Sequence, residues 1–176
     1  MKNPSVSIRE ARTDDAPALV AAEKETAGRP GLLVSRPYEL KLKAFEQKIV
    51  ELRRIGRYVV AERGGKIVGH AFLDPLPLEA ISHVFRLTIV VHPDFTSQGV
   101  GTALMMDLMD WAKRNSPLGK IELLVRATNE RAIRLYSKLG FVEEGRMRNR
   151  VRLPDGNFVD DVAMAWFPKD RHSDNQ

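Results

Sequence analysis

The sequence predicts an α+β (mixed α/β) fold, in which a mostly antiparallel central sheet carries helices on both faces. Hydrophobic residues make up 43% and charged residues 29% of the 176 residues. This composition is typical of a globular protein with one hydrophobic core. Segments of alternating apolar residues, typical of strands, are interleaved with segments of helical periodicity. Consecutive strand-like segments in the middle of the chain, followed by strand–helix units, favour a mixed sheet.

The first third of the chain predicts one strand and two helices. Residues 5–12 alternate apolar and polar side chains, as a half-buried strand does. A Thr-Asp-Asp run offers N-caps for a helix that begins at Ala16 and is broken by the Gly-Arg-Pro-Gly run at 28–31. A second helix is expected over residues 38–55. Its helical spacing is set by Leu42, Phe45, Ile49 and Leu52.

The middle of the chain predicts three strands and a helix. Residues 57–62 and 66–74 are strand-like and are joined by Arg-Gly-Gly, which is a hairpin signal. Residues 83–92 form the next expected strand, with apolar side chains on both faces. A glycine-bearing turn then leads into a helix expected over residues 99–115.

The last third predicts a strand at 120–126, a helix at 129–139 stopped by Gly140, and a closing strand pair at 141–153 and 157–166. No repeat or linker interrupts these elements. We therefore expect one domain over residues 1–168, followed by a polar tail at 169–176.

The charge and residue counts narrow the classes of ligand and location. Lys and Arg total 28 against 23 Asp and Glu, and the formal net charge of +5 favours an anionic ligand, such as nucleic acid or a small polyphosphate. The absence of cysteine excludes disulfides, thiolate metal sites and a cysteine nucleophile. The four histidines have no metal-ligand spacing, so no metal is assigned. Without a membrane-length apolar run or a signal-peptide core, a cytoplasmic protein with no membrane partner is expected.

A glycine loop at residues 98–102, Gln-Gly-Val-Gly-Thr, lies between an expected strand and an expected helix. Glycines let the backbone approach a ligand closely, and free N–H groups at a helix N-terminus favour a phosphate or pyrophosphate. Leu104 stands where a dinucleotide fingerprint has its third glycine, and no Walker Gly-Lys-Ser/Thr follows. An ordinary turn before a core helix is the competing interpretation.

A second motif lies on the expected helix at 129–139. Asn129, Ala132 and Tyr136 fall on one helical face, and Gly140-Phe141 follow the helix. Taken alone, Asn129 would be a helix cap and Tyr136 a core aromatic.

Together the two motifs resemble the GNAT superfamily of acyl-CoA-dependent N-acyltransferases, over residues 6–166. The family pattern Asn-x-x-Ala-x-x-x-Tyr-x-x-x-Gly-Phe is matched at every position of the second motif. The resemblance implies a GNAT-type fold and acetyl-CoA as co-substrate, with its pyrophosphate in the glycine loop. The sequence departs from the family at Thr96, where Arg or Gln is usual, so one phosphate contact is in doubt.

The resemblance implies that three stretches contact the cofactor: the end of the strand at 83–92, the glycine loop and the helix of the second motif. The strand end would pair with the pantetheine arm and offer N–H groups to the oxyanion. The expected cofactor-binding residues are Ile89, Val90, Val91, Thr96, Ser97, Gln98, Gly99, Val100, Gly101, Thr102, Asn129, Ala132 and Tyr136.

The resemblance also implies the chemistry, in which a primary amine attacks the thioester directly. Tyr136 would protonate the departing thiolate. A base must take the proton of the amine, and the candidates are Glu122, Asp160 and, more weakly, Glu25. The competing interpretation of Glu122 is a solvent-facing glutamate without a catalytic role.

The leading expectation is an enzyme, an acetyl-CoA-dependent N-acetyltransferase (acyltransferase) acting on a small amine, an amino acid or a protein N-terminus. The alternative is a non-catalytic acyl-CoA-binding sensor or scaffold. A nucleic-acid binder ranks third, because the chain lacks a helix-turn-helix or RNA-module pattern. A homodimer is expected from the family alone. The alternating Arg146, Arg148, Arg150 and Arg152 predict one basic strand face, either solvated or facing an acidic acceptor.

Overall fold

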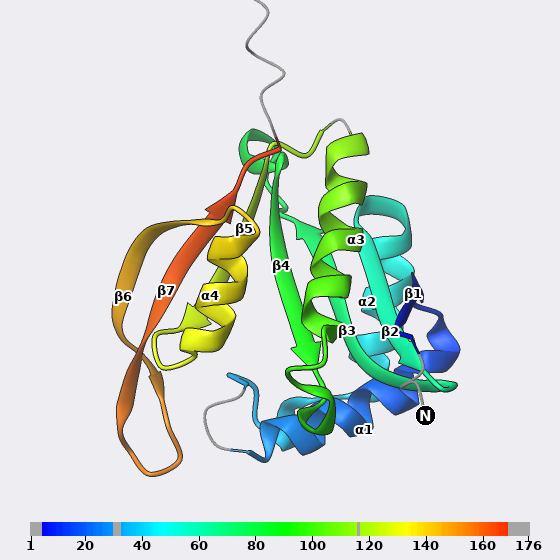
Figure 1. The fold of residues 1–176 in the computed structure, drawn as a ribbon, viewed down its shortest axis with the longest axis horizontal. Helices are drawn as coiled ribbons and strands as arrows, with labels where there is room; N and C mark the ends of the chain where they lie inside the picture. Colours follow the sequence, from blue (N-terminus) through cyan, green and yellow to red (C-terminus); the bar gives the residue numbers. More distant parts are fainter. Residues whose placement is uncertain (1–4, 30–32, 116, 169–176) are drawn as a thin grey trace, which may run out of the picture. The chain divides into compact units, whose positions relative to one another are not determined.

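The structure is a computed structural model that describes residues 5–29, 33–115 and 117–168. Each predicted strand and helix is present in that part of the chain, in the predicted order (Figure 1). The strands are β1 (Ser7–Glu10), β2 (Arg57–Arg63), β3 (Lys66–Pro75), β4 (Val84–Val91), β5 (Lys120–Arg126), β6 (Val142–Arg152) and β7 (Phe158–Trp166). The helices are α1 (Ala16–Ala27), α2 (Leu42–Ile55), α3 (Val100–Arg114) and α4 (Glu130–Lys138).

Within the described residues the strands form a seven-stranded sheet of order β1-β2-β3-β4-β5-β7-β6. β4 and β5 run parallel, whereas the pairs β1–β2, β2–β3, β5–β7 and β6–β7 are antiparallel. The predicted fold class, a mixed and mostly antiparallel sheet with helices, is therefore confirmed.

The chain divides into two compact units, which are described separately. Unit 1 comprises the described residues of Met1–Asp74 and Thr88–Leu108, and unit 2 those of Pro75–Leu87 and Met109–Gln176. The single domain expected over residues 1–168 stays a prediction, and the expected tail at 169–176 lies outside the described residues.

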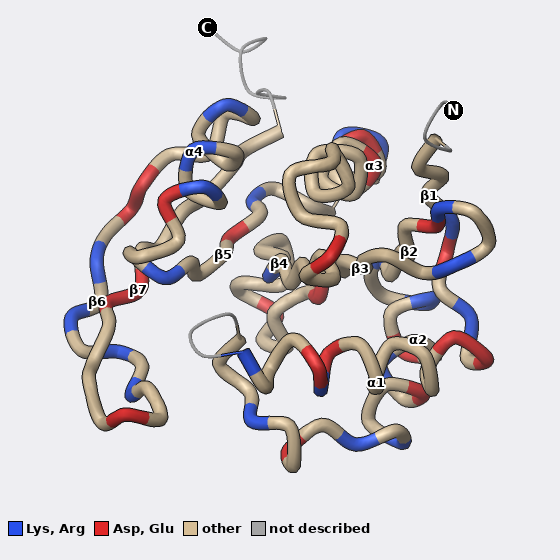
Figure 2. The backbone as a smooth tube through the Cα atoms, turned by 60° about the horizontal axis from the view of Figure 1, so that its bottom comes forward, with Lys and Arg blue, Asp and Glu red and all other residues tan. Residues whose placement is uncertain are grey.

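In unit 1, α1 and α2 cover one face of the strands and the first turns of α3 cover the other (Figure 2). The core under α1 and α2 consists of Ala11, Ala16, Leu19, Ile49, Leu52, Tyr58 and Val60. On the opposite face, a Cβ at Gly69 would lie 3.0 Å from the Val90 carbonyl oxygen and 3.1 Å from Val100 Cγ1. Glycine at this position therefore lets the start of α3 pack closely on β3.

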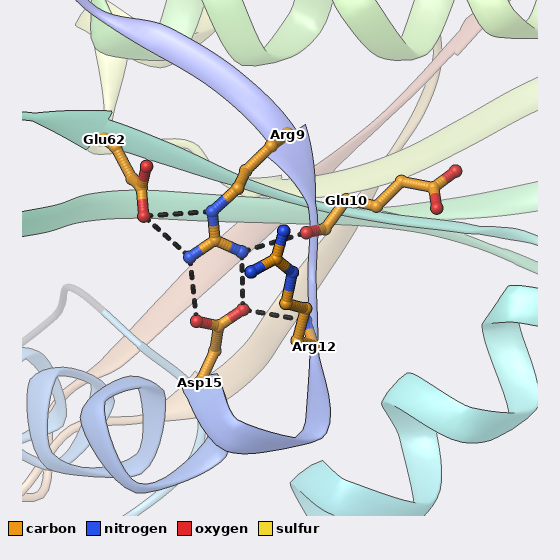
Figure 3. A network of polar contacts seen from close by, with 5 residues as sticks. All are labelled: Arg9, Glu10, Arg12, Asp15 and Glu62. Carbon is orange, nitrogen blue, oxygen red and sulfur yellow. Dashed lines mark hydrogen bonds and ion pairs between the residues drawn. The ribbon is translucent and has the colours of Figure 1, made fainter. Parts of the chain in front are cut away.

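An ion-pair network joins β1, β2 and the start of α1 (Figure 3). Arg9 binds both carboxylate oxygens of Asp15 at 2.8 Å and, through Nε, Glu62 at 2.9 Å. Asp15 also accepts the backbone N–H of Arg12 at 2.7 Å. These contacts, led by the hydrogen bond from Arg9, hold the pKa of Asp15 below its usual value.

In unit 2, β5 lies between β4 and β7, and β6 is the edge strand. Phe141 packs against Tyr136 and Trp166, with ring centroids 5.8 and 6.5 Å apart. These contacts bring α4 and β7 against the start of β6.

The prediction that one face of β6 carries all four arginines is wrong for the middle of the strand. Asn149 has φ +52°, and the register with β7 shifts between Met147 and Val151. Three residues of β6, Arg148 to Arg150, therefore stand opposite the single β7 residue Asp160, and the alternation assumed for the four arginines is interrupted there.

The second helix begins at Leu42, later than the predicted residue 38. Residues Pro37–Glu39 form a separate 3₁₀ turn, in which Glu39 accepts the backbone N–H of Arg36 at 2.6 Å. Leu40 and Lys41 are extended, so the turn and the helix are not continuous. The hydrogen bond between Glu39 and the Arg36 backbone therefore holds this segment in a separate turn, although the sequence pattern predicted a continuous helix.

Candidate active site

The glycine loop of unit 1 has the geometry expected of an anion site. Ser97 and Gly99 have φ +61° and +81°, in the left-handed region, and no atom lies within 4 Å of a Cβ built on Gly99. The hydrogen bond from Ala103 N–H to the Gly99 carbonyl, 3.0 Å, belongs to the first turn of α3. The N–H groups of Val100, Gly101 and Thr102 precede it and have no acceptor within the helix. The start of this helix of 15 residues therefore fits a phosphate group.

The sequence interpretation missed Arg63, which contacts the glycine loop. Its Nη2 donates to the Gln98 carbonyl at 3.2 Å, and its Nη1 donates to the Gln98 side-chain oxygen. The Thr96 hydroxyl donates within the loop to the Pro93 carbonyl at 3.1 Å. Arg63 therefore brings a positive charge to a loop whose own sequence departs from the family at Thr96. Its place before the Gly-Gly hairpin gave no sign of this role.

The end of β4 lies in the same unit as the loop. Val90 is buried, and Ile89 and Val91 are half-buried. The next residue, His92, donates its backbone N–H to the Val68 carbonyl at 3.0 Å. This bond fixes the chain at the end of β4, just before the turn Pro93–Phe95 that leads to the loop.

The second motif lies in unit 2. The side chain of Asn129 caps α4 by accepting the Ala132 N–H at 3.2 Å. Tyr136, one turn after Ala132 on α4, is buried, and burial raises its pKa to about 12. Its hydroxyl therefore keeps its proton at neutral pH, which is the form that a proton donor needs.

Each of the three carboxylates proposed as bases has a partner. Glu122 of β5 accepts from Arg86 on the neighbouring β4 at 2.8 Å. Asp160 accepts the backbone N–H of Asn149 at 2.8 Å and so holds the β6 bulge. Glu25 is exposed and lies 3.4 Å from Arg29.

A buried polar cluster in unit 1 was also missed. It consists of Glu23 on α1, Tyr58 on β2 and His70 on β3, which are buried, and of the half-buried His92. The Tyr58 hydroxyl is 3.0 Å from His70 Nδ1, and His70 Nε2 is 3.1 Å from Glu23 Oε1, without a hydrogen bond between these two atoms. The rings of His70 and His92 are 6.5 Å apart. In the sequence, the only local signal of this cluster was a histidine inside the otherwise apolar run at residues 67–73.

Arg126 and Asp161 are two further buried charged side chains, in unit 2, with no salt bridge between them in the part of the chain that the structure describes. They stand opposite each other in the β5–β7 register, and both are buried. Arg126 Nε and Nη2 and Asp161 Oδ1 make no hydrogen bond within the described residues. Burial lowers the pKa of Arg126, and the charge of Asp161 opposes that shift.

The chain matches the model of the acetyltransferase (GNAT) family over residues 18–141. It is 33% identical to the L-amino acid N-acetyltransferase AaaT of Escherichia coli over 109 residues, which cover 62% of this chain and 67% of that protein. It is 27% identical to the phosphinothricin N-acetyltransferase of Alcaligenes faecalis over 161 residues, covering 90% of this chain and 80% of that protein.

Solved structures show the same fold. A GNAT-family acetyltransferase from Streptococcus pneumoniae superposes with a TM-score of 0.85 at 25% identity, covering 93% of this chain and 99% of that one. The putative acetyltransferase yncA from Salmonella typhimurium, solved with acetyl-CoA, has a TM-score of 0.85 at 19% identity and covers 96% of both chains.

This chain therefore belongs to the acetyltransferase (GNAT) family. The predicted family is confirmed, and so are the predicted enzyme class, an N-acetyltransferase, and its co-substrate, acetyl-CoA. No helix in the described ranges is both long and apolar enough to cross a membrane.

Proposed function

We propose that this N-acetyltransferase moves the acetyl group of acetyl-CoA directly to the primary amine of a small amine, an amino acid or a protein N-terminus. The observation that carries the proposal is the glycine loop, where the start of α3 and Arg63 together offer N–H donors and positive charge. Relatives act, by their names, on L-amino acids, spermidine and a ribosomal protein alanine.

The residues present fit acetyl-CoA. Left-handed Ser97 and Gly99 bring the backbone round to the start of α3, and the open space beside Gly99 leaves room for a pyrophosphate. We assign the pyrophosphate contacts to residues 96–102 and the pantetheine and oxyanion contacts to Ile89, Val90 and Val91. Asn129 and Ala132 stay predicted cofactor contacts. Acetyl-CoA supplies an acetyl group activated as a thioester.

The reaction needs one proton donor and one proton acceptor. Tyr136, protonated at neutral pH, is the proposed donor to the departing sulfur. Glu122 and Asp160 stay candidate acceptors, although Arg86 and the β6 bulge already use their oxygens.

The test is release of CoA thiol from acetyl-CoA with a panel of amines that includes amino acids, polyamines and peptides with free N-termini. Acetyl-CoA binding is measured beside it by thermal shift. At a hundred times its dissociation constant, a ligand that binds only the folded state adds about 2.7 kcal/mol to the free energy of unfolding. Binding without turnover on any amine would contradict the proposed function.

We also propose that the protein acts in the cytoplasm as a homodimer. The chain contains no cysteine, so it has no disulfide that would require an oxidising compartment, and this supports the cytoplasmic location.

The proposed dimer is supported by the last two strands. β6 is an edge strand, and the β6–β7 hairpin exposes Val142, Met147 and Phe158. Light scattering after size exclusion tests the dimer, and a monomer at micromolar concentration would contradict it.

A further inference from the structure

We propose that the exposed ion pair of Arg86 and Glu122 binds a free amino acid, with the carboxylate of the ligand against Arg86 and its ammonium group against Glu122. The inference rests on the proposed amine acetylation and chooses among its three classes of acceptor. Every residue that carries it belongs to unit 2.

Arg86 and Glu122 are direct neighbours on the parallel strands β4 and β5. Arg86 donates from Nε at 3.2 Å and from Nη2 at 2.8 Å, and both hydrogen bonds go to the same oxygen, Glu122 Oε1. Among the described residues, Arg86 Nη1 and Glu122 Oε2 have no hydrogen-bond partner. A donor on a positive group and an acceptor on a negative group therefore stay available side by side.

The pair is accessible to solvent. The side chains of Arg86 and Glu122 are 58% and 27% exposed. Water weakens an exposed ion pair, so both groups can bind a ligand in addition to each other. Lys120, the neighbouring cation on β5, is instead held by Glu144 at 2.7 Å and lies over the ring of Phe167. Arg86 is therefore the better placed of the two cations to receive an anionic group.

The pair lies on the face of the sheet opposite to α4. Successive residues of a strand point to opposite faces, and residues paired across two strands point to the same face. Trp166 points toward α4, because it packs on Phe141, which in turn packs on Tyr136. Ala165 and its partner Glu122 therefore point to the other face.

Apolar surface lies beside the pair on this face. Leu124, two residues beyond Glu122 on β5, is 41% exposed and is paired with Ala163 on β7. Because Ala163 and Ala165 have small side chains, Leu124 is the larger apolar group of this part of the face. A hydrocarbon group bound here would remove Leu124 from water.

A free amino acid has the matching chemistry. Its ammonium nitrogen and carboxylate oxygens are attached through one carbon and lie about 3 Å apart. Arg86 Nη2 and Glu122 Oε1 are 2.8 Å apart, so the opposite charges of the ligand and of the pair can face each other. The planar guanidinium is well suited to a carboxylate. An apolar side chain of the amino acid would then extend over Leu124.

The other two classes of acceptor fit the pair less well. The first residue of a protein chain has an amide carbonyl where a free amino acid has its carboxylate. A simple amine has no group for Arg86, and a polyamine adds only positive charge, which Arg86 repels. The pair therefore selects for a negative charge next to the amine.

Calorimetric titration of the CoA-bound protein tests the proposal without turnover, because CoA has no acetyl group to transfer. The probes are leucine, methionine and phenylalanine, each beside its amide and its decarboxylated amine. At least one of the amino acids should bind about tenfold or more tightly than its amide and its amine. Equal affinities within every set, or no binding of any of the amino acids, would overturn the proposal.

Arg86→Gln keeps a polar side chain and removes the positive charge. It should weaken binding of the amino acid by about tenfold or more and leave the affinities of the amide and the amine within about twofold, which a loss of folding would not do. Arg134→Gln on α4 is the matched control, because its ion pair with Glu130 is also exposed, and it should bind all probes as the wild type does. A preference for the amino acid that persists in Arg86→Gln would overturn the proposal.

Kinetics with acetyl-CoA separates this proposal from the proposed function. The kcat/KM of the amino acid should exceed that of its amide and its amine, and Arg86→Gln should remove the difference. Equal kcat/KM values within each set would overturn the inference and leave the proposed function standing. Binding of an amino acid that depends on Arg86, without acetylation of any amine, would instead contradict the proposed function.

Discussion

Arg63, the last residue of β2, donates to the backbone carbonyl of Gln98, which is 35 residues further along the chain. The contact brings a guanidinium to the loop at the start of α3, where Thr96 uses its own hydroxyl within the loop. Gln98 in turn donates from Nε2 to the Asp94 carbonyl at 2.9 Å. The shape of the loop therefore depends on a residue outside the motif.

The first prediction concerns this contact. Arg63→Ala should weaken acetyl-CoA binding by about tenfold, because it removes a charge and two charge-assisted hydrogen bonds that hold the loop. Lys66→Ala, an exposed lysine across the same hairpin, is the matched control and should bind normally. Calorimetric titration measures both, and equal affinities would show that Arg63 does not support the loop.

Tyr136→Phe tests the proton donor. Loss of the hydroxyl should lower kcat by about 10²-fold, since the departing sulfur then has no positioned acid. Packing against Phe141 is retained by the phenylalanine ring, so the Kd of acetyl-CoA should change little. The measurement is steady-state CoA release beside equilibrium binding. Unchanged kcat would remove Tyr136 from this role.

Asp161→Asn tests the electrostatic coupling between two buried charges, Asp161 and Arg126. Removal of the carboxylate charge takes away the attraction that opposes the burial of the Arg126 guanidinium, which should cost about 2 kcal/mol of unfolding free energy. Asp110→Asn on the exposed side of α3, which loses only a surface pair with Lys113, should cost less than about 1 kcal/mol. Urea denaturation measures both. Equal costs would mean that the buried charges are not coupled.

Asp15 makes stability depend on pH in a definite direction. Its pKa is lowered in the folded protein, so the unfolded chain binds the proton more tightly. The stabilisation is full above the unfolded pKa of about 3.9 and is lost as pH falls through the folded pKa. The stability difference between the wild type and Asp15→Asn should therefore shrink below about pH 4. A difference that grows on acidification would contradict the assignment.

Local periodicity predicted most of the secondary structure. The strand expected at 120–126 coincides with β5, because a buried strand between clear turn signals is defined by its own residues. The later start of α2 and the bulge at Asn149 could not be predicted in this way. Both depend on contacts of single side chains, Glu39 with the Arg36 backbone and Asp160 with the Asn149 backbone.

The candidate site divides in the same way. The glycine loop and the Asn129–Tyr136 pattern are contiguous motifs, so the sequence by itself determined the family, the co-substrate and the class of reaction. Only the tertiary structure decided that Arg63 supports the loop and that Glu23, Tyr58 and His70 form one buried chain. These residues come from separate strands and a helix, and strand register and helix packing bring them together. No local spacing in the chain encodes such long-range contacts, because their geometry exists only once the core has formed.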